Sequence, residues 1–298
     1  MTIEAKVIAH SRAAGAPDLI TLQLRYPRFI HSEFMTHRVF SRNASSSRAI
    51  PVERMIQDVI DDPAMPVAWG SNKPGMQAGE ECTNPVVLPD LEAWTRGEDY
   101  GSAYTAQEAW LEARDLAVRS ARGFAAAGYH KQIVNRLLEP FAHISVVCTA
   151  TNWQNFFDLR CHPDADPTMR ALAEAMRDAI EESVPVEFTH GKDFWHLPYV
   201  ETGDWHAVID RLNTTGGTLK NDFSNTLAMI SAARCARVSY LNHDGSNPDI
   251  EKDLALAKRL LESKHMSPFE HQAVRSPGTK SANFLGWRQY RQMIEALA

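Results

Sequence analysis

The chain has 298 residues, of which 44% are hydrophobic and 23% are charged, which is typical of a soluble globular protein that forms its core without disulfides. Lys and Arg number 31 against 37 Asp and Glu, which gives a formal net charge of -6. This balance argues against a protein whose whole surface binds nucleic acid, so any anion site is expected to be local.

The four cysteines lie far apart without a CxxC pair, which argues against a zinc knuckle and a disulfide framework and favours a reducing compartment. His265 and His271 are six residues apart without a carboxylate partner, so we predict no metal site. Residues 1–15 lack the apolar run of a signal peptide, and no segment approaches the roughly 18 apolar residues of a membrane helix. We therefore expect a cytoplasmic protein that does not bind membranes.

The first predicted elements are a strand and a short helix. Residues 18–27 alternate apolar and polar side chains up to Pro27, which predicts a half-buried strand. Ile30, Phe34 and Arg38 follow at a spacing of four, as in a short helix. The next predicted feature is an irregular insertion rich in Pro, Gly and Asn.

Two helices are predicted after that insertion. Thr105 and Glu108 have the spacing of a capping box at the start of the first, and Gly128 is expected to end it. The predicted inner face of this helix consists of Trp110, Ala113, Ala117, Ala121 and Phe124. Residues 129–140 are predicted to form the second helix, ended by Pro140.

The remaining elements are a strand over residues 143–151, a helix capped by Asp166 with Pro167 in its first turn, and a late helix starting at Asn247 and Pro248. We predict one domain over 1–298. Its parts are 1–62 with the first strand and a polar motif, the insertion 63–104, a helical part 105–185, a linker or second insertion 186–222, and a final segment 223–298.

The polar motif is THRVFSRNASSSR, residues 36–48. It combines a histidine, three arginines, an asparagine and four serines. Guanidinium groups and hydroxyls are suited to phosphates and carboxylates. The motif therefore predicts an anion-binding site.

This motif resembles the signature of the flavin-dependent thymidylate synthases, which reads Arg-His-Arg, two residues, Ser, one residue, Asn, two residues, Ser, one residue, Arg. All fixed positions except the first are present, as His37, Arg38, Ser41, Asn43, Ser46 and Arg48. Four further segments are similar to family segments: 134–140, 155–160, 236–240 and 264–271. The last two come first in the family, so the chain resembles a circular permutation, which a fold tolerates when its original termini lie close together.

The resemblance implies an α+β fold with a mixed or antiparallel central sheet flanked by helices, in permuted segment order. It also implies a homotetramer with active sites shared between subunits. The implied reaction is the conversion of dUMP to dTMP, with FAD as cofactor and methylenetetrahydrofolate and NADPH as co-substrates.

The resemblance also assigns roles to individual residues. The implied FAD contacts are His37, Arg38, Asn43, Asn155, Ser239, His265 and Ser267. The implied nucleotide contacts are Ser46, Ser47, Arg48 and Arg136, mainly at the phosphate. Arg160 is expected to bind the pyrimidine ring and to stabilise the charge that develops there, so Arg160 and Arg48 are the implied catalytic residues.

Five positions depart from the family pattern. Thr36 replaces the first signature arginine and Glu33 an earlier glutamine, both of which contact the nucleotide in the family. Ala44 and Ile133 replace glutamates, and Ser47 replaces a glycine. The part of the site that recognises the base is therefore expected to be altered.

Two hypotheses follow from these departures. Gln289 with Arg288 or Arg291 replaces the lost glutamine and arginine, since this segment directly follows the 264–271 motif. Alternatively, the enzyme acts on dCMP or leaves a hydroxymethyl group, because the Glu33 carboxylate accepts hydrogen bonds where an amide also donates.

Two other classes of protein stay open. One is a non-catalytic nucleotide-binding relative, which Thr36, Ala44 and Ile133 permit. The other is a single-stranded nucleic-acid binder that uses Arg and aromatic side chains of 25–48 and 284–291, although the acidic overall charge argues against it.

Overall fold

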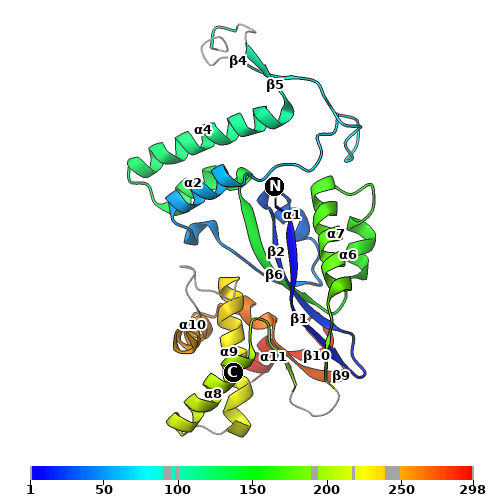
Figure 1. Ribbon diagram of the computed structural model, residues 1–298, viewed down its shortest axis with the longest axis vertical. Helices are drawn as coiled ribbons and strands as arrows, with labels where there is room; N and C mark the ends of the chain where they lie inside the picture. Colours follow the sequence, from blue (N-terminus) through cyan, green and yellow to red (C-terminus); the bar gives the residue numbers. More distant parts are fainter. Residues whose placement is uncertain are drawn as a thin grey trace.

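The computed structural model of the chain describes residues 2–89, 95–97, 101–188, 194–216, 219–238 and 249–296. A central sheet is flanked by helices, with the C-terminal helices gathered at one end and a hairpin projecting at the other (Figure 1). The predicted α+β class with a mixed sheet is confirmed. Within the described residues, no helix is both long and apolar enough to cross a membrane.

The central sheet has five strands in the order β3-β6-β2-β1-β7. Its members are β1 (Glu4–Ala13), β2 (Leu19–Pro27), β3 (Ser41–Ala44), β6 (His143–Ala150) and β7 (Val186–Phe188). β7 pairs with β1 in parallel and the other pairs are antiparallel, so the sheet is mixed. β3 is an edge strand, which places the polar motif at the rim of the sheet.

The strand predicted over 18–27 is confirmed as β2, but it is not half-buried. Leu22 and Leu24 enter the main core, and Thr21 on the opposite face is also fully buried. The reason is that later segments cover this second face, as shown by the hydrogen bond between Tyr199 Oη and Gln23 Oε1 (2.8 Å).

The main core lies between the sheet and two helices, α6 (Gln154–Arg160) and α7 (Pro167–Glu182), which stand beside it in Figure 1. The predicted cap of α7 is confirmed, because Asp166 Oδ1 accepts hydrogen bonds from the backbone nitrogens of Thr168 and Met169. α6 begins directly after the turn that follows β6, and Arg160 is its last residue.

The segment before β6 also contains α2 (Val52–Asp61) and α4 (Ala106–Ala126), which share a second hydrophobic core. The capping box of Thr105 and Glu108 is confirmed. The predicted inner face of α4 is partly wrong, since Ala113 and Phe124 are exposed, whereas Ala109 and Val118 are buried.

The insertion 63–104 is less irregular than predicted, because β4 (Val86–Pro89) and β5 (Gly101–Tyr104) pair in a hairpin. The second predicted helix is shorter, with α5 (Lys131–Val134) followed by the 3-10 helices η3 (Asn135–Leu137) and η4 (Glu139–Phe141). Pro140 does not end the helix but lies in the first turn of η4, a position where a missing N–H is tolerated.

The segment 186–222, predicted to be a loop-like linker or a second insertion, contains regular secondary structure. This segment contains β7, β8 (Trp195–His196) and α8 (Thr202–Thr215), and α9 (Leu219–Arg237) begins within it. α8 starts with a capping box between Glu201 and Asp204, a carboxylate version of the usual Ser or Thr cap.

The C-terminal part packs α8 and α9 against α10 (Ile250–Glu262) and α11 (Tyr290–Glu295), with the 3-10 helix η5 (Ser267–Glu270) and a small sheet of β8, β9 (Ala273–Ser281) and β10 (Phe284–Gln289). The start predicted for α10 is shifted, since Asp249 caps it and Asn247 and Pro248 lie outside the described residues.

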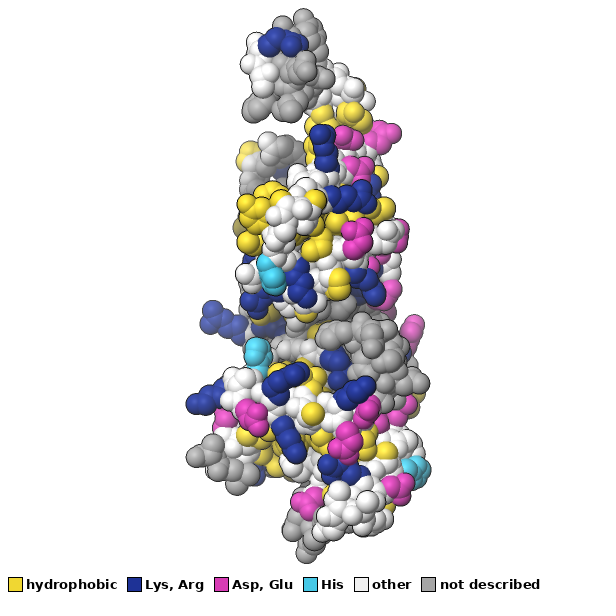
Figure 2. All heavy atoms as spheres, turned by 90° about the vertical axis from the view of Figure 1, so that its left-hand side faces the viewer, with side chains coloured by type: hydrophobic (Ala, Val, Ile, Leu, Met, Phe, Trp, Pro, Cys, Tyr) yellow, Lys and Arg dark blue, Asp and Glu magenta, His cyan; other side chains and the backbone are white. Residues whose placement is uncertain are grey.

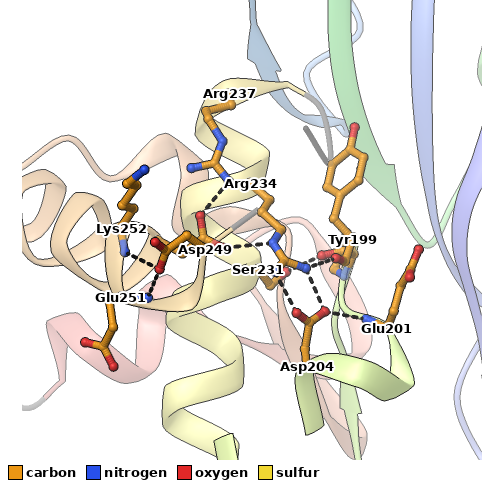
Figure 3. A network of polar contacts seen from close by, with 11 residues as sticks. Tyr199, Glu201, Asp204, Ser231, Arg234, Arg237, Asp249, Glu251 and Lys252 are labelled. Atoms are coloured by element: carbon orange, nitrogen blue, oxygen red, sulfur yellow. Dashed lines mark hydrogen bonds and ion pairs between the residues drawn. The ribbon is translucent and has the colours of Figure 1, made fainter. Parts of the chain in front are cut away.

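An ion network lies inside this C-terminal part (Figure 3). Arg234 on α9 is fully buried and contacts both oxygens of Asp204 at 2.7 Å, Asp253 Oδ2 at 2.9 Å and the carbonyl of Tyr199 at 2.6 Å. Arg237 adds a 2.5 Å contact to Asp253. Two cations and two carboxylates thereby neutralise one another between α8, α9 and α10.

A buried row of polar side chains joins the sheet to the C-terminal part. His196 Nε2 contacts Thr21 Oγ1 (2.7 Å), which contacts Thr149 Oγ1 (2.7 Å), which contacts His271 Nδ1 (2.8 Å). His196 Nδ1 also contacts Ser11 Oγ (2.8 Å). Burial lowers the pKa of both histidines to about 3, so both imidazoles are neutral at pH 7.

Candidate active site

The polar motif divides between the two faces of the sheet. It follows α1 (His31–Phe34), runs through β3 and ends in the 3-10 helix η2 (Ser47–Ala49). Because side chains alternate along a strand, Ser41 and Asn43 contact the C-terminal part, whereas Arg42 donates to the Phe34 carbonyl (2.8 Å) on the other side. The motif thus supplies side chains to more than one cluster.

The first cluster consists of Glu33, His37 and Arg160. Arg160 Nη1 forms an ion pair with Glu33 Oε1, and Arg160 Nε donates to His37 Nε2 at 2.9 Å. The cluster is fixed where α1 meets α6, since the His37 ring packs edge-on against Phe156 with centroids 4.8 Å apart. A cation, a carboxylate and an imidazole therefore meet in one half-buried position.

His37 is neutral in this cluster. Burial lowers its pKa, and the positive charges of Arg160 and Arg42 lower it further. Since Nε2 accepts the hydrogen bond from Arg160, the single ring proton resides on Nδ1. The imidazole is therefore fixed as one tautomer and serves as an acceptor for the arginine.

The second cluster lies between η2 and η3. Ser47 Oγ donates to Glu139 Oε1 (2.6 Å), and Asn135 Nδ2 donates to the carbonyls of Ser47 (2.7 Å) and Ile50 (2.9 Å). These bonds hold two 3-10 turns together, and each turn carries one exposed arginine, Arg48 or Arg136. Neither arginine forms an ion pair with a residue of the described part of the chain.

The third cluster fastens the C-terminal part to β3. Asn43 Nδ2 donates to the Cys235 carbonyl (2.8 Å), and Asn43 Oδ1 accepts from Ser267 Oγ (3.0 Å). Gln289 Nε2 is within 3.2 Å of Ser41 Oγ and also contacts the Glu270 carbonyl at 3.1 Å. The segments that the resemblance identifies as permuted thus lie against the His-Arg motif.

The structure therefore places Arg48 and Arg136 on two adjoining turns and brings Glu33 together with His37 and Arg160. Among these described residues, no hydrogen bond or ion pair joins the two groups. Four other predicted residues are exposed: Arg38, Ser46, Asn155 and His265. Ser239 lies outside the described residues. The described residues contain no group of three or more His, Cys, Asp or Glu that could hold a metal ion.

The proposed replacements for the lost glutamine and arginine have internal partners. Gln289 is almost fully buried within the third cluster. Arg291 pairs with Glu270 at 2.5 Å and with Glu295 at 2.8 Å. Their role in nucleotide binding stays a prediction. It requires that Gln289 and Arg291 share these internal contacts with the nucleotide or exchange them for contacts with it.

Three departures from the family pattern have local structural reasons. Thr36 Oγ1 bonds the Glu33 carbonyl (2.7 Å) and so closes α1. Ala44 packs against the main core, where a carboxylate would be partly desolvated. Ser47 donates to Glu139. Sequence reasoning missed Glu139 and Asn135, because neither residue stands out in a segment that also carries Arg136.

The model of the family described as thymidylate synthase complementing protein matches residues 18–186. No curated protein matches the chain.

Among solved structures, the UMP/dUMP methylase PolB from Streptomyces cacaoi bound with 5-Br dUMP is similar with a TM-score of 0.44 and 14% identity, over 61% of this chain and 90% of that one. The flavin dependent thymidylate synthase ThyX from Helicobacter pylori, complexed with FAD and dUMP, is similar with a TM-score of 0.35 and 18% identity, over 54% of this chain and 67% of that one.

Proposed function

This chain belongs to the thymidylate synthase complementing protein family, and on that premise we propose that it transfers a one-carbon unit from methylenetetrahydrofolate to C5 of a pyrimidine deoxynucleoside monophosphate, converting dUMP to dTMP. FAD is the proposed cofactor and NADPH the proposed reductant. The observation that carries the proposal is the cluster of Glu33, neutral His37 and Arg160, which lies entirely within the matched segment.

Arg48, Arg136 and Ser46 bind the nucleotide phosphate in this proposal. Arg48 and Arg136 extend from two 3-10 turns that Asn135 ties together, and both arginines lack an ion pair among the described residues. Two guanidinium forks and a hydroxyl match the acceptor oxygens of a phosphate monoester. Arg48 also neutralises the charge of the bound substrate.

Arg160 binds the pyrimidine ring. Its side chain is largely shielded from water, with 20% of its surface exposed, so its charge acts at short range with less screening than on the open surface. Negative charge develops on the ring as C5 becomes nucleophilic, and a fixed guanidinium stabilises that charge. Because His37 is neutral, it does not compete with Arg160 for the negative charge on the pyrimidine ring. His37 Nε2 accepts the hydrogen bond that holds Arg160 Nε in place.

Part of the predicted flavin-binding set fits such a cofactor. The exposed side chains of Arg38, Asn155 and His265 form no hydrogen bond with a described residue, so these donors are available to flavin oxygens and to its pyrophosphate. Asn43 and Ser267 form a hydrogen bond with each other, so they can contact the flavin only if they share that hydrogen bond with it. When bound, the flavin supplies the hydride chemistry that reduces the transferred carbon to a methyl group.

A homotetramer with shared sites is part of the proposal. Exposed apolar side chains gather at the end of α4 and on the turns that follow it, namely Phe124, Tyr129, Ile133 and Leu137. Figure 2 shows hydrophobic side chains on the face that carries this end of α4, with Lys and Arg side chains below them. A contiguous apolar surface beside the Arg136 turn supports a subunit contact next to the phosphate site.

The Glu33–Arg160 pair favours a second candidate, in which dCMP is the substrate or a hydroxymethyl group is the product. A carboxylate beside the ring-binding arginine accepts a hydrogen bond from an exocyclic amino group as readily as from a ring N–H. Cytosine presents that amino group, whereas uracil presents a carbonyl oxygen.

The test is turnover with product identification. Purified protein supplied with FAD, NADPH and methylenetetrahydrofolate is incubated anaerobically with dUMP or with dCMP, and the products are identified by mass. The proposal expects dTMP from dUMP. A methylated cytosine nucleotide, or a hydroxymethylated product of either substrate, supports the second candidate. Binding of dUMP without any product contradicts both and identifies a non-catalytic relative.

A further inference from the structure

Arg160 is held from two directions by residues of one short segment. Glu33 lies in α1 and His37 just after it, and their side chains contact Nη1 and Nε of the same guanidinium. Arg160 itself ends α6, where Phe156 one turn earlier packs against the His37 ring. Glu33 and Arg160 therefore lie in packed helices, and His37, in the turn after α1, is held by its contact with Phe156.

The remaining donors of Arg160 are open. Arginine carries five N–H donors, and these two contacts engage one on Nε and one on Nη1. Among the described residues, none contacts Nη2. The Glu33 side chain is 33% exposed, so the pair borders the solvent and its outer side is accessible to a small molecule.

We propose that Glu33 is a positioning residue for Arg160, an inference that rests on the proposed function. Its carboxylate fixes the direction of the guanidinium, keeps Nε against His37 and leaves Nη2 for the pyrimidine ring. Glu33 thus acts through Arg160.

Two physical effects make such a contact useful. A long arginine side chain loses rotamer freedom when it binds a ligand, and a side chain already fixed loses less. An arginine without a counter-ion would also be attracted to the nucleotide phosphate, whereas the Glu33 charge keeps Arg160 at the ring end of the site.

The first experiment observes the cluster without any reaction. Nitrogen NMR of the histidines is recorded for the wild type, for Glu33→Gln, which keeps the shape and removes the charge, and for Glu33→Asp, which keeps the charge but shortens the reach. The wild type should show His37 protonated on Nδ1, and both variants should shift toward protonation on Nε2. The control is Glu174→Gln, which makes the same change in the exposed Arg170–Glu174 pair and should leave the His37 signal unchanged.

The second experiment separates positioning from direct contact. Glu33→Gln should lower kcat roughly tenfold while KM for the nucleotide changes by less than about threefold, because orientation acts on the reacting complex. In an Arg160→Lys background the same substitution should have no further effect. A further loss in that background would show that Glu33 contacts the substrate itself and would overturn the inference.

Failure of the inference is distinguishable from failure of the proposed function. If the wild type yields no product from dUMP or dCMP, the function is wrong, and the NMR comparison still decides whether Glu33 positions Arg160 against His37. An unchanged His37 signal in folded Glu33→Gln and Glu33→Asp proteins would overturn the inference whether or not the wild type is active.

Discussion

Arg234 and Arg160 are both arginines paired with carboxylates, and they differ in how completely they are enclosed. Arg234 has 0% of its side chain exposed, and contacts Asp204, Asp253 and a backbone carbonyl. Arg160 is 20% exposed, contacts one carboxylate and one neutral imidazole, and has an open Nη2 among the described residues.

The difference separates a structural arginine from one that we propose to be functional. A fully enclosed cation whose donors are directed at carboxylates and a carbonyl joins three helices and has no donor placed for a ligand. A cation at the border of solvent with open donors is arranged to bind something else. Charge alone does not distinguish the two arginines, whereas their exposure and the open donors of Arg160 do.

Arg234→Met should have the largest effect on stability. It leaves the Asp204 and Asp253 carboxylates buried without their main partner, which costs about 3–5 kcal/mol of unfolding free energy. Urea unfolding followed by circular dichroism measures it. Arg170→Met on the exposed face of α7 is the control and should change stability by less than about 1 kcal/mol. Equal effects of the two substitutions would remove the structural role assigned to Arg234.

Arg160→Lys should act on turnover and hardly on stability. A lysine keeps the charge but cannot contact Glu33, His37 and a ligand with one planar fork, so kcat should fall about 10²–10³-fold. Unfolding free energy should change by about 1 kcal/mol or less because the pair is partly exposed. A large loss of stability with normal kcat would make Arg160 a structural arginine like Arg234.

The enclosed histidines should make stability depend on pH. Burial lowers the pKa of His196 and His271 from 6.5 to about 3 in the folded protein. Between pH 6.5 and 3 the unfolded chain binds more protons, so stability falls as the pH falls, by up to about 1.4 kcal/mol per pH unit for each histidine. His271→Gln should flatten this slope in urea unfolding from pH 7 to 5. An unchanged slope would mean that His271 is not enclosed.

Asn43→Ala and Asn155→Ala should show the smallest effects. The first should lower stability, and the second should weaken flavin binding. Asn43 fastens Ser267 and Cys235 to β3, so its loss should cost about 1–2 kcal/mol of unfolding free energy. Asn155 is exposed, so its loss should leave stability within about 0.5 kcal/mol and weaken flavin binding, measured by titration of FAD fluorescence. The reverse pattern would exchange the roles of the two asparagines.

Local patterns predicted much of the fold and the family. The caps at Thr105 and Asp166 are confirmed because a cap depends on residues within one turn. β2 and β6 are confirmed, since a run of β-branched and apolar side chains needs no distant partner to be recognised. The His-Arg motif identified the family correctly from side chains that are contiguous in sequence.

Long-range contacts account for what sequence reasoning missed. The Glu33–Arg160 pair joins residues 127 positions apart, and His196 meets Thr21 across 175 positions. Neither contact leaves a local pattern. α8 was missed because its cap is a glutamate, and the second face of β2 was expected to be solvated because the segment that covers it, including Tyr199, lies far along the chain.

The most direct measurement is a crystal structure of the assembled protein with FAD and dUMP bound. We expect Arg160 to lie within hydrogen-bond distance of the pyrimidine ring while still paired with Glu33. Arg48 and Arg136, from the same or a neighbouring subunit, should lie at the phosphate. A nucleotide bound away from Arg160, with the three arginines on separate faces and no shared cleft even between subunits, would contradict it.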